Sequence, residues 1–236
     1  FVQWMEEEGS DIFWITRKPG SGKSTLMKFI FGAQATLSSL QKWAGDRSLL
    51  ILSSYFWISG SKMQQSKAGF FRHLLHQAIE SHPEFALEVF AKTLRAYRVL
   101  GPFPFRWGDE ELRELLYSLL QMAQKTLRVA IFIDGLDKYG GDSGDVITLL
   151  DKIRAGSTSG ILDQDTRKNC TGLKLYVSSR KWNEFRARFF DNPKPKMEIL
   201  NGADIKRYVA DKLSRLATFN SYHLGTRADW ENPEAG

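Results

Sequence analysis

The chain of 236 residues has a single cysteine, Cys170, and lacks any long hydrophobic run. One cysteine cannot form an internal disulfide or a cysteine-based zinc site, which favours a reducing compartment and hence the cytoplasm. The longest apolar stretch, residues 49–59, is interrupted by Ser53 and Ser54 and is far shorter than the ~20 residues that a spanning helix needs. A membrane-spanning protein is therefore excluded within these residues.

A concentrated charge of one sign is also missing. The chain has 33 basic and 27 acidic side chains, and its net charge is +6. Basic surfaces attract the phosphates of nucleic acids, but here the basic residues are scattered, with no long run and no aromatic-interleaved patch. This distribution disfavours nucleic acid as the main partner. The 42% of apolar residues and 25% of charged residues are typical of a globular protein.

Apolar runs of strand length alternate with helical periodicities along the chain. Strands are predicted at 12–16, 49–57, 129–133, 173–177 and 197–200, and helices at 23–31, 70–79, 84–97, 112–120, 146–153 and 205–216. Strands that alternate with helices imply parallel crossovers, so the predicted fold class is α/β, with a sheet covered on both faces. We expect a lead-in helix within 1–11, one domain over 12–216 and a polar tail at 217–236. The chain opens on Phe1, so we expect it to be a piece of a longer protein.

A glycine-rich segment lies where the first predicted strand turns into the first helix. It reads Lys18, Pro19, Gly20, Ser21, Gly22, Lys23, Ser24 and Thr25. Glycines let backbone N–H groups surround phosphate oxygens, and the helix N-terminus adds a positive dipole end. Lys23 would reach the β- and γ-phosphates of a nucleotide, and the Ser24 hydroxyl would bind Mg²⁺. Residues Pro19 to Thr25 are therefore the predicted nucleotide site, and the alternative is an ordinary strand–helix turn.

Two further strand ends carry charged residues. The run 129–133 is followed by Asp134 and Asp137, and Arg180 follows the run 173–177. Asp134 is predicted to hold Mg²⁺ with Ser24, Asp137 to position an attacking water, and Arg180 to contact the γ-phosphate. The alternatives are a surface turn at Asp134 and a salt-bridged surface arginine at Arg180.

These stretches, with Trp182, Asn183 and the segment 204–209, resemble the NACHT-type domain of STAND NTPases over residues 1–216. The likeness is to fungal NLR-like proteins, whose domain is also described as nephrocystin-3-like N-terminal. The resemblance implies a three-layer phosphate-loop fold, with a five-stranded parallel sheet flanked by helices. It also implies ATP or GTP with Mg²⁺, and a switch that self-associates when loaded. Effector and repeat domains of the same chain would be further partners.

Two positions depart from that pattern. Arg17 replaces the first loop glycine, where it either adds charge to phosphate binding or blocks the loop. Lys138 replaces a glutamate, and losing general-base help costs about 10²–10⁴-fold in rate. We therefore predict a nucleotide-binding signalling switch with weak or absent hydrolysis. The alternative is a non-hydrolysing interaction scaffold, whereas a small-molecule kinase is disfavoured because residues 142–165 contain too little arginine for a lid.

Overall fold

The computed structural model describes residues 2–7, 12–16, 22–57, 61, 63–101, 107–155, 172–180 and 183–189. The chain divides into two compact units, Phe1–Lys194 and Pro195–Gly236, and all the described residues lie in the first. Several predictions of the sequence analysis fall outside the described residues: the loop from Arg17 to Ser21, the strand 197–200, the helix 205–216 and the tail. The bounds of the domain, 12–216, stay a prediction.

Four strands form one parallel sheet in the described part of the chain. They are β1 (Ile12–Thr16), β2 (Ser48–Tyr55), β3 (Leu127–Asp134) and β4 (Leu173–Ser179), in the order β1-β4-β3-β2. The parallel α/β prediction is confirmed, but the sheet has four described strands and not the five that the resemblance implies. The fifth predicted strand, 197–200, lies outside the described residues. Both central strands, β3 and β4, are buried at every position, which is why apolar residues predominate in both.

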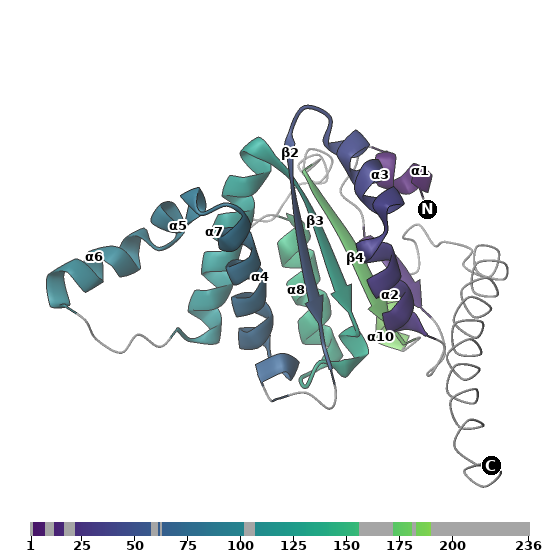
Figure 1. Ribbon diagram of the computed structural model, residues 1–236. Coiled ribbons are helices and arrows are strands. Elements are labelled where there is room, and N and C mark those ends of the chain that lie inside the picture. Colours follow the sequence, from purple (N-terminus) through teal and green to yellow (C-terminus); the bar gives the residue numbers. More distant parts are fainter. Residues whose placement is uncertain are drawn as a thin grey trace, which may run out of the picture. The chain divides into compact units, whose positions relative to one another are not determined.

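Helices cover both faces of the sheet, so the unit has three layers (Figure 1). One face carries α1 (Val2–Glu6), α2 (Lys23–Gly32) and α3 (Gln34–Ala44); the other carries α4 (Lys67–Ser81), α7 (Asp109–Thr126), α8 (Ser143–Ala155) and α10 (Asn183–Phe189). Two shorter helices, α5 (Glu84–Val89) and α6 (Ala91–Leu100), follow α4. The short 3₁₀ turns η1 (Met63–Gln65) and η2 (Leu136–Lys138) follow β2 and β3.

The sheet has one core on each face, because successive side chains of a strand point to opposite faces. On the face beneath α4, α7 and α8 most strand residues are aliphatic, and Ile131 and Leu175 share one core with leucines of α7 and with phenylalanines of α4 and α10. The opposite face is aromatic. There Tyr176 stacks on Phe132 with ring centroids 4.2 Å apart, and Trp4 of α1 meets Tyr176 edge-on at 5.2 Å. These two cores pack against β3 and β4, the central strands of the sheet.

The helix boundaries follow local chemistry. Helix α4 begins after Ser66, whose side-chain oxygen accepts a hydrogen bond from the Gly69 N–H at 3.1 Å. It ends at Ser81, before His82 and Pro83, because the residue before a proline avoids the helical conformation. Helix α7 begins after Gly108, whose N–H donates to the Glu111 carboxylate at 2.9 Å. The single helix predicted over 84–97 is instead two helices that meet at Phe90.

Helices α3 and α10 were not predicted from the sequence. The sequence of α3, QATLSSLQKWA, is rich in polar residues, and Thr36 and Ser39 are nevertheless buried in it. Its apolar stripe is therefore weak in the sequence. Within the described residues, no helix has both the length and the apolar character that crossing a lipid bilayer requires.

Candidate functional site

The described residues predicted for the site gather at one end of the sheet. Because the strands are parallel, their carboxyl ends share an edge, which is where open α/β sheets bind ligands. Asp134 is the last residue of β3, Arg180 follows β4, and Lys23 opens α2. The Lys138 ammonium donates a hydrogen bond to Ser24 Oγ at 3.2 Å and so joins η2 to the start of α2. Pro19, Gly20 and Ser21 lie outside the described residues.

The N-terminus of α2 has the form of an anion site. Gly22 immediately precedes the helix with φ 76° and ψ 20°, a left-handed conformation that favours glycine. No side chain caps this end of the helix. The N–H groups of a first helical turn have no partner within the helix, and the helix dipole adds partial positive charge there. An anion placed at this end would be stabilised by both effects.

Lys23 is half-buried beside the strand ends. Burial lowers the pKa of its ammonium group, the charges of Arg180 and Lys138 lower this pKa further, and the carboxylates of Asp137 and Asp134 act in the opposite direction. These four groups therefore act on Lys23 at short range. The structure brings Lys23, Ser24, Asp134, Asp137 and Arg180 together, as the sequence predicted for residues from three distant segments.

Asp134 is buried, at 2% exposure, and both of its carboxylate oxygens have partners. Oδ1 accepts a short hydrogen bond from the Ser178 hydroxyl, and Oδ2 lies 3.7 Å from Lys138 Nζ. The Gly135 N–H donates to both the backbone oxygen and the side-chain oxygen of Ser178, each at 3.1 Å. The end of β3 is thus fixed to β4 through Ser178.

Lys138 lies between the two residues that were predicted to bind Mg²⁺. Its side chain passes over Gly135, where an added Cβ would lie 2.9 Å from Lys138 Cδ and where φ is +78°. Mg²⁺ requires an octahedral shell of oxygens at about 2.0–2.1 Å. Unit charges of like sign 4 Å apart repel by about 4 kcal/mol at a partly exposed site. With Lys138 in this position, Ser24 and Asp134 do not fit a magnesium ion between them.

Asp137 and Arg180 form a pair. The Arg180 N–H donates to Asp137 Oδ1 at 2.9 Å, and Arg180 Nε makes an ion pair with Oδ2, also at 2.9 Å. The Asp137 side chain is 1% exposed and the Arg180 side chain 38%. The pair would have to break before Asp137 could position a water or Arg180 could contact a γ-phosphate. Their predicted roles stay predictions.

Residues that the sequence analysis assigned no role also build the site. Besides Ser178, the indole of Trp14 in β1 donates to Ser179 Oγ at 2.8 Å in the interior. This contact joins the strand before the phosphate loop to the strand that carries Arg180. Two serines at a strand end are a visible signal, but their partners depend on the strand order, which local sequence patterns do not contain.

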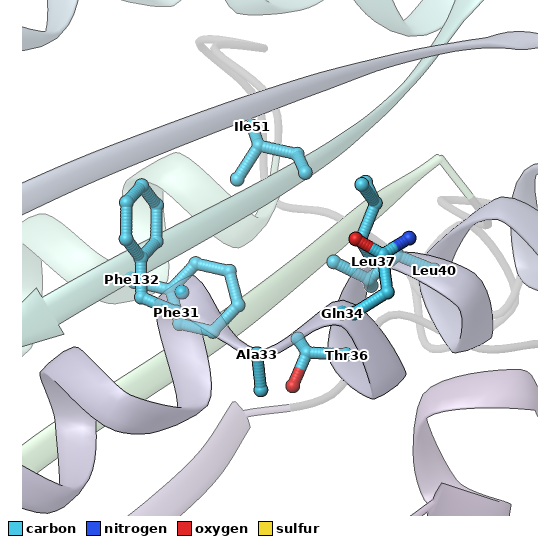
Figure 2. A pocket seen from close by; sticks show the side chains of 9 residues that line it. Phe31, Ala33, Gln34, Thr36, Leu37, Leu40, Ile51 and Phe132 are labelled. Atoms are coloured by element: carbon cyan, nitrogen blue, oxygen red, sulfur yellow. The ribbon is translucent and has the colours of Figure 1, made fainter.

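A pocket of about 180 Å³ lies at the opposite end of α2, so it is separate from this site (Figure 2). Phe31 and Phe132 line it and meet edge-on at 5.4 Å, with Leu37 and Ile51 across from them. A ten-residue helix is about 15 Å long, so the pocket is remote from Lys23. Within the described ranges, no three His, Cys, Asp or Glu side chains are grouped to hold a metal.

Fold and site together define a three-layer α/β protein with a charged cluster at the carboxyl ends of a parallel sheet. The family model described as nephrocystin 3, N-terminal, matches residues 1–180, a range that ends on Arg180 and includes every residue of the cluster. The chain belongs to this family. The resemblance to a nephrocystin-3-like N-terminal domain is therefore confirmed. No curated protein matches the chain.

Proposed function

We propose that this domain binds a nucleoside triphosphate, ATP or GTP, and acts as a NACHT-type switch within a longer signalling chain. The observation that carries the proposal is the convergence of Lys23, at the uncapped N-terminus of α2, with Asp134 and Arg180 at neighbouring strand ends. Such a cluster combines main-chain donors with cations, which is the chemistry that holds polyphosphates.

Each group has a defined task in this proposal. The first-turn N–H groups of α2 and the Lys23 ammonium bind phosphate oxygens, together with the loop residues Pro19, Gly20 and Ser21. Ser24 and Thr25 continue the same turn. Arg180 contacts the terminal phosphate when it leaves Asp137, and this exchange is the step that would report nucleotide loading. Loading would promote self-association or contact with effector and repeat domains.

Hydrolysis is expected to be slow because no carboxylate in the described cluster is available to polarise water. Asp134 is held by Ser178 and Lys138, and Asp137 is held by Arg180. Without general-base help the rate falls about 10²–10⁴-fold. The domain would therefore hold a nucleotide for long periods rather than turn it over.

The test is a titration of the purified protein with fluorescent ATP and GTP analogues. Lys23→Ala removes one charge-assisted contact, worth about 1.5–3 kcal/mol, so its Kd should rise about 10- to 150-fold. Lys152→Ala, an exposed lysine on α8, is the matched control and should bind like the wild type. Equal affinity in Lys23→Ala and wild type would exclude the proposed phosphate site.

A non-hydrolysing interaction scaffold is the second candidate. The observation in its favour is the apolar surface of α5 and α6, where Leu87, Tyr97 and Val99 are 71%, 52% and 81% exposed. Figure 1 shows α6 extending away from the sheet. Self-association without nucleotide binding, measured by light scattering alongside the titration, would favour this alternative.

A further inference from the structure

The Lys138 side chain holds a positive charge at a fixed place in the site. Its ammonium donates to Ser24 Oγ at 3.2 Å, lies 3.7 Å from Asp134 Oδ2, and belongs to a side chain that is 22% exposed. The absence of a Cβ at Gly135 leaves room for the methylenes of Lys138 to cross the turn. The charge is therefore positioned by the backbone and by two partners on separate elements.

An ammonium group has three N–H donors. Here one is directed to the hydroxyl of Ser24, and the attraction of Asp134 orients the group on a second side. The third N–H can donate a hydrogen bond to an oxygen of a phosphate group bound next to Lys23. The place between Ser24 and Asp134 is thus held by a cation that is covalently part of the chain.

The net charge of the described cluster also favours the binding of a polyanion. Lys23, Lys138 and Arg180 face the carboxylates of Asp134 and Asp137, which leaves one net positive charge. A glutamate at position 138 would leave one net negative charge, and a polyphosphate would then need an added cation. With lysine, the cluster already attracts a polyanion.

We propose that Lys138 is a built-in counter-cation of the nucleotide site, so that a nucleoside triphosphate binds this domain without a divalent metal ion. The inference rests on the proposed function, because it concerns how that nucleotide is bound. Lys138 is then a residue that binds the nucleotide. From the sequence alone, lysine at position 138 predicted only the loss of a general base for hydrolysis. The domain then responds to nucleotide whether or not magnesium is present.

The experiment compares a fluorescent ATP analogue in excess EDTA and in excess Mg²⁺. The wild type should bind with closely similar Kd in both conditions. Lys138→Glu should bind at least about tenfold more weakly in EDTA and should recover when Mg²⁺ is added, because the glutamate restores a place for the metal. Lys138→Met, which removes the charge without adding an acid, should be weaker in both conditions. Lys152→Glu, with the same charge change on α8, should behave like the wild type.

A second measurement uses the metal alone. Electron paramagnetic resonance of Mn²⁺ should show no binding to the wild type without nucleotide, and binding to Lys138→Glu. Circular dichroism and thermal melting of each variant confirm that it is folded before either measurement.

The outcomes separate the two proposals. Wild-type protein that binds the analogue only with Mg²⁺, or that binds Mn²⁺ by itself, would overturn the counter-cation role and leave nucleotide binding in place. Folded wild-type protein that binds the analogue in neither condition would overturn the proposed function and with it this inference.

Discussion

Removal of the Ser178 hydroxyl tests whether the buried end of β3 depends on a single side chain of β4. Ser178 is 0% exposed, and its hydroxyl donates to the Asp134 carboxylate while accepting from the Gly135 N–H. In Ser178→Ala the Gly135 N–H keeps its second acceptor, the Ser178 backbone oxygen at 3.1 Å. The carboxylate, in contrast, loses a donor that water cannot easily replace at a 2% exposed position.

The magnitude follows from that difference. A hydrogen bond to a charged group contributes about 1.5–3 kcal/mol, and Ser→Ala leaves almost no cavity. We therefore expect the free energy of unfolding to fall by about 2 kcal/mol. For a domain of 150–250 residues this lowers Tm by roughly 4–8 °C. Urea denaturation followed by tryptophan fluorescence measures the change, and an unaltered slope with denaturant would show that the unfolded state is the same.

Ser39→Ala is the matched control for Ser178→Ala. The Ser39 hydroxyl also donates to a carboxylate, Glu6 Oε1 at 3.1 Å, but the Glu6 side chain is 32% exposed and also pairs with Lys42. Water can replace that hydroxyl, so the loss of stability should be clearly smaller. Equal losses in the two variants would refute the reasoning, because burial of the acceptor would then not matter. So would a loss below about 0.5 kcal/mol in Ser178→Ala.

Three further predictions concern the core and the site. Burial raises the pKa of Tyr117 to about 12, and its hydroxyl has no hydrogen-bond partner among the described residues, so stability should fall as pH rises from 10 to 12. Tyr117→Phe should remove part of that loss, at most about 2.7 kcal/mol in unfolding measured against pH. Because the pKa of Lys23 is lowered, its side chain should become reactive toward acetylation at a lower pH than the ε-amine of free Nα-acetyl-lysine does. Bound nucleotide should protect Lys23 from acetylation, and mass spectrometry of the labelled peptide would measure both effects. Phe132→Ala should lower the free energy of unfolding by about 3–5 kcal/mol, because it removes the ring stacked on Tyr176 and enlarges the neighbouring pocket. Chemical denaturation measures this change, and a loss below about 1 kcal/mol would contradict the packing described.

The central strands and the longest helices could be predicted from the sequence because burial dictates their composition. Strand β3, residues 127–134, is buried throughout and is apolar almost throughout, and the buried face of α7 carries leucines at 112, 116, 119 and 120. Helix α3 was missed since it packs with serine and threonine, which carry no strong periodic signal. The break at Phe90 was missed because helix propensity is similar on both sides of it.

The charged residues of the site could be predicted from their places at strand ends, but their pairings could not. Asp137 and Arg180 are 43 residues apart, and nothing in either segment indicates that the two would bind one another. The pairing follows from the order β1-β4-β3-β2, which places β4 beside β3. The position of Lys138 between Ser24 and Asp134 likewise depends on the turn at Gly135, whose left-handed φ brings the chain back over the strand end.

Stability at this end of the sheet depends mainly on groups other than Lys138. Ser178 and Asp134 lie inside the packed layer, whereas the Lys138 side chain is 22% exposed and contacts Asp134 at a longer distance of 3.7 Å. Only the lysine of this pair is partly exposed, since the Asp134 side chain is 3% exposed. Lys138→Met should therefore lower the free energy of unfolding, and Lys138→Glu should lower it further because it places a second carboxylate beside the buried Asp134. The two apolar cores fix β3 and β4 whichever residue stands at 138. We therefore expect Lys138→Glu to keep the fold with a lower free energy of unfolding, and under the proposed function its nucleotide binding would then depend on a metal ion.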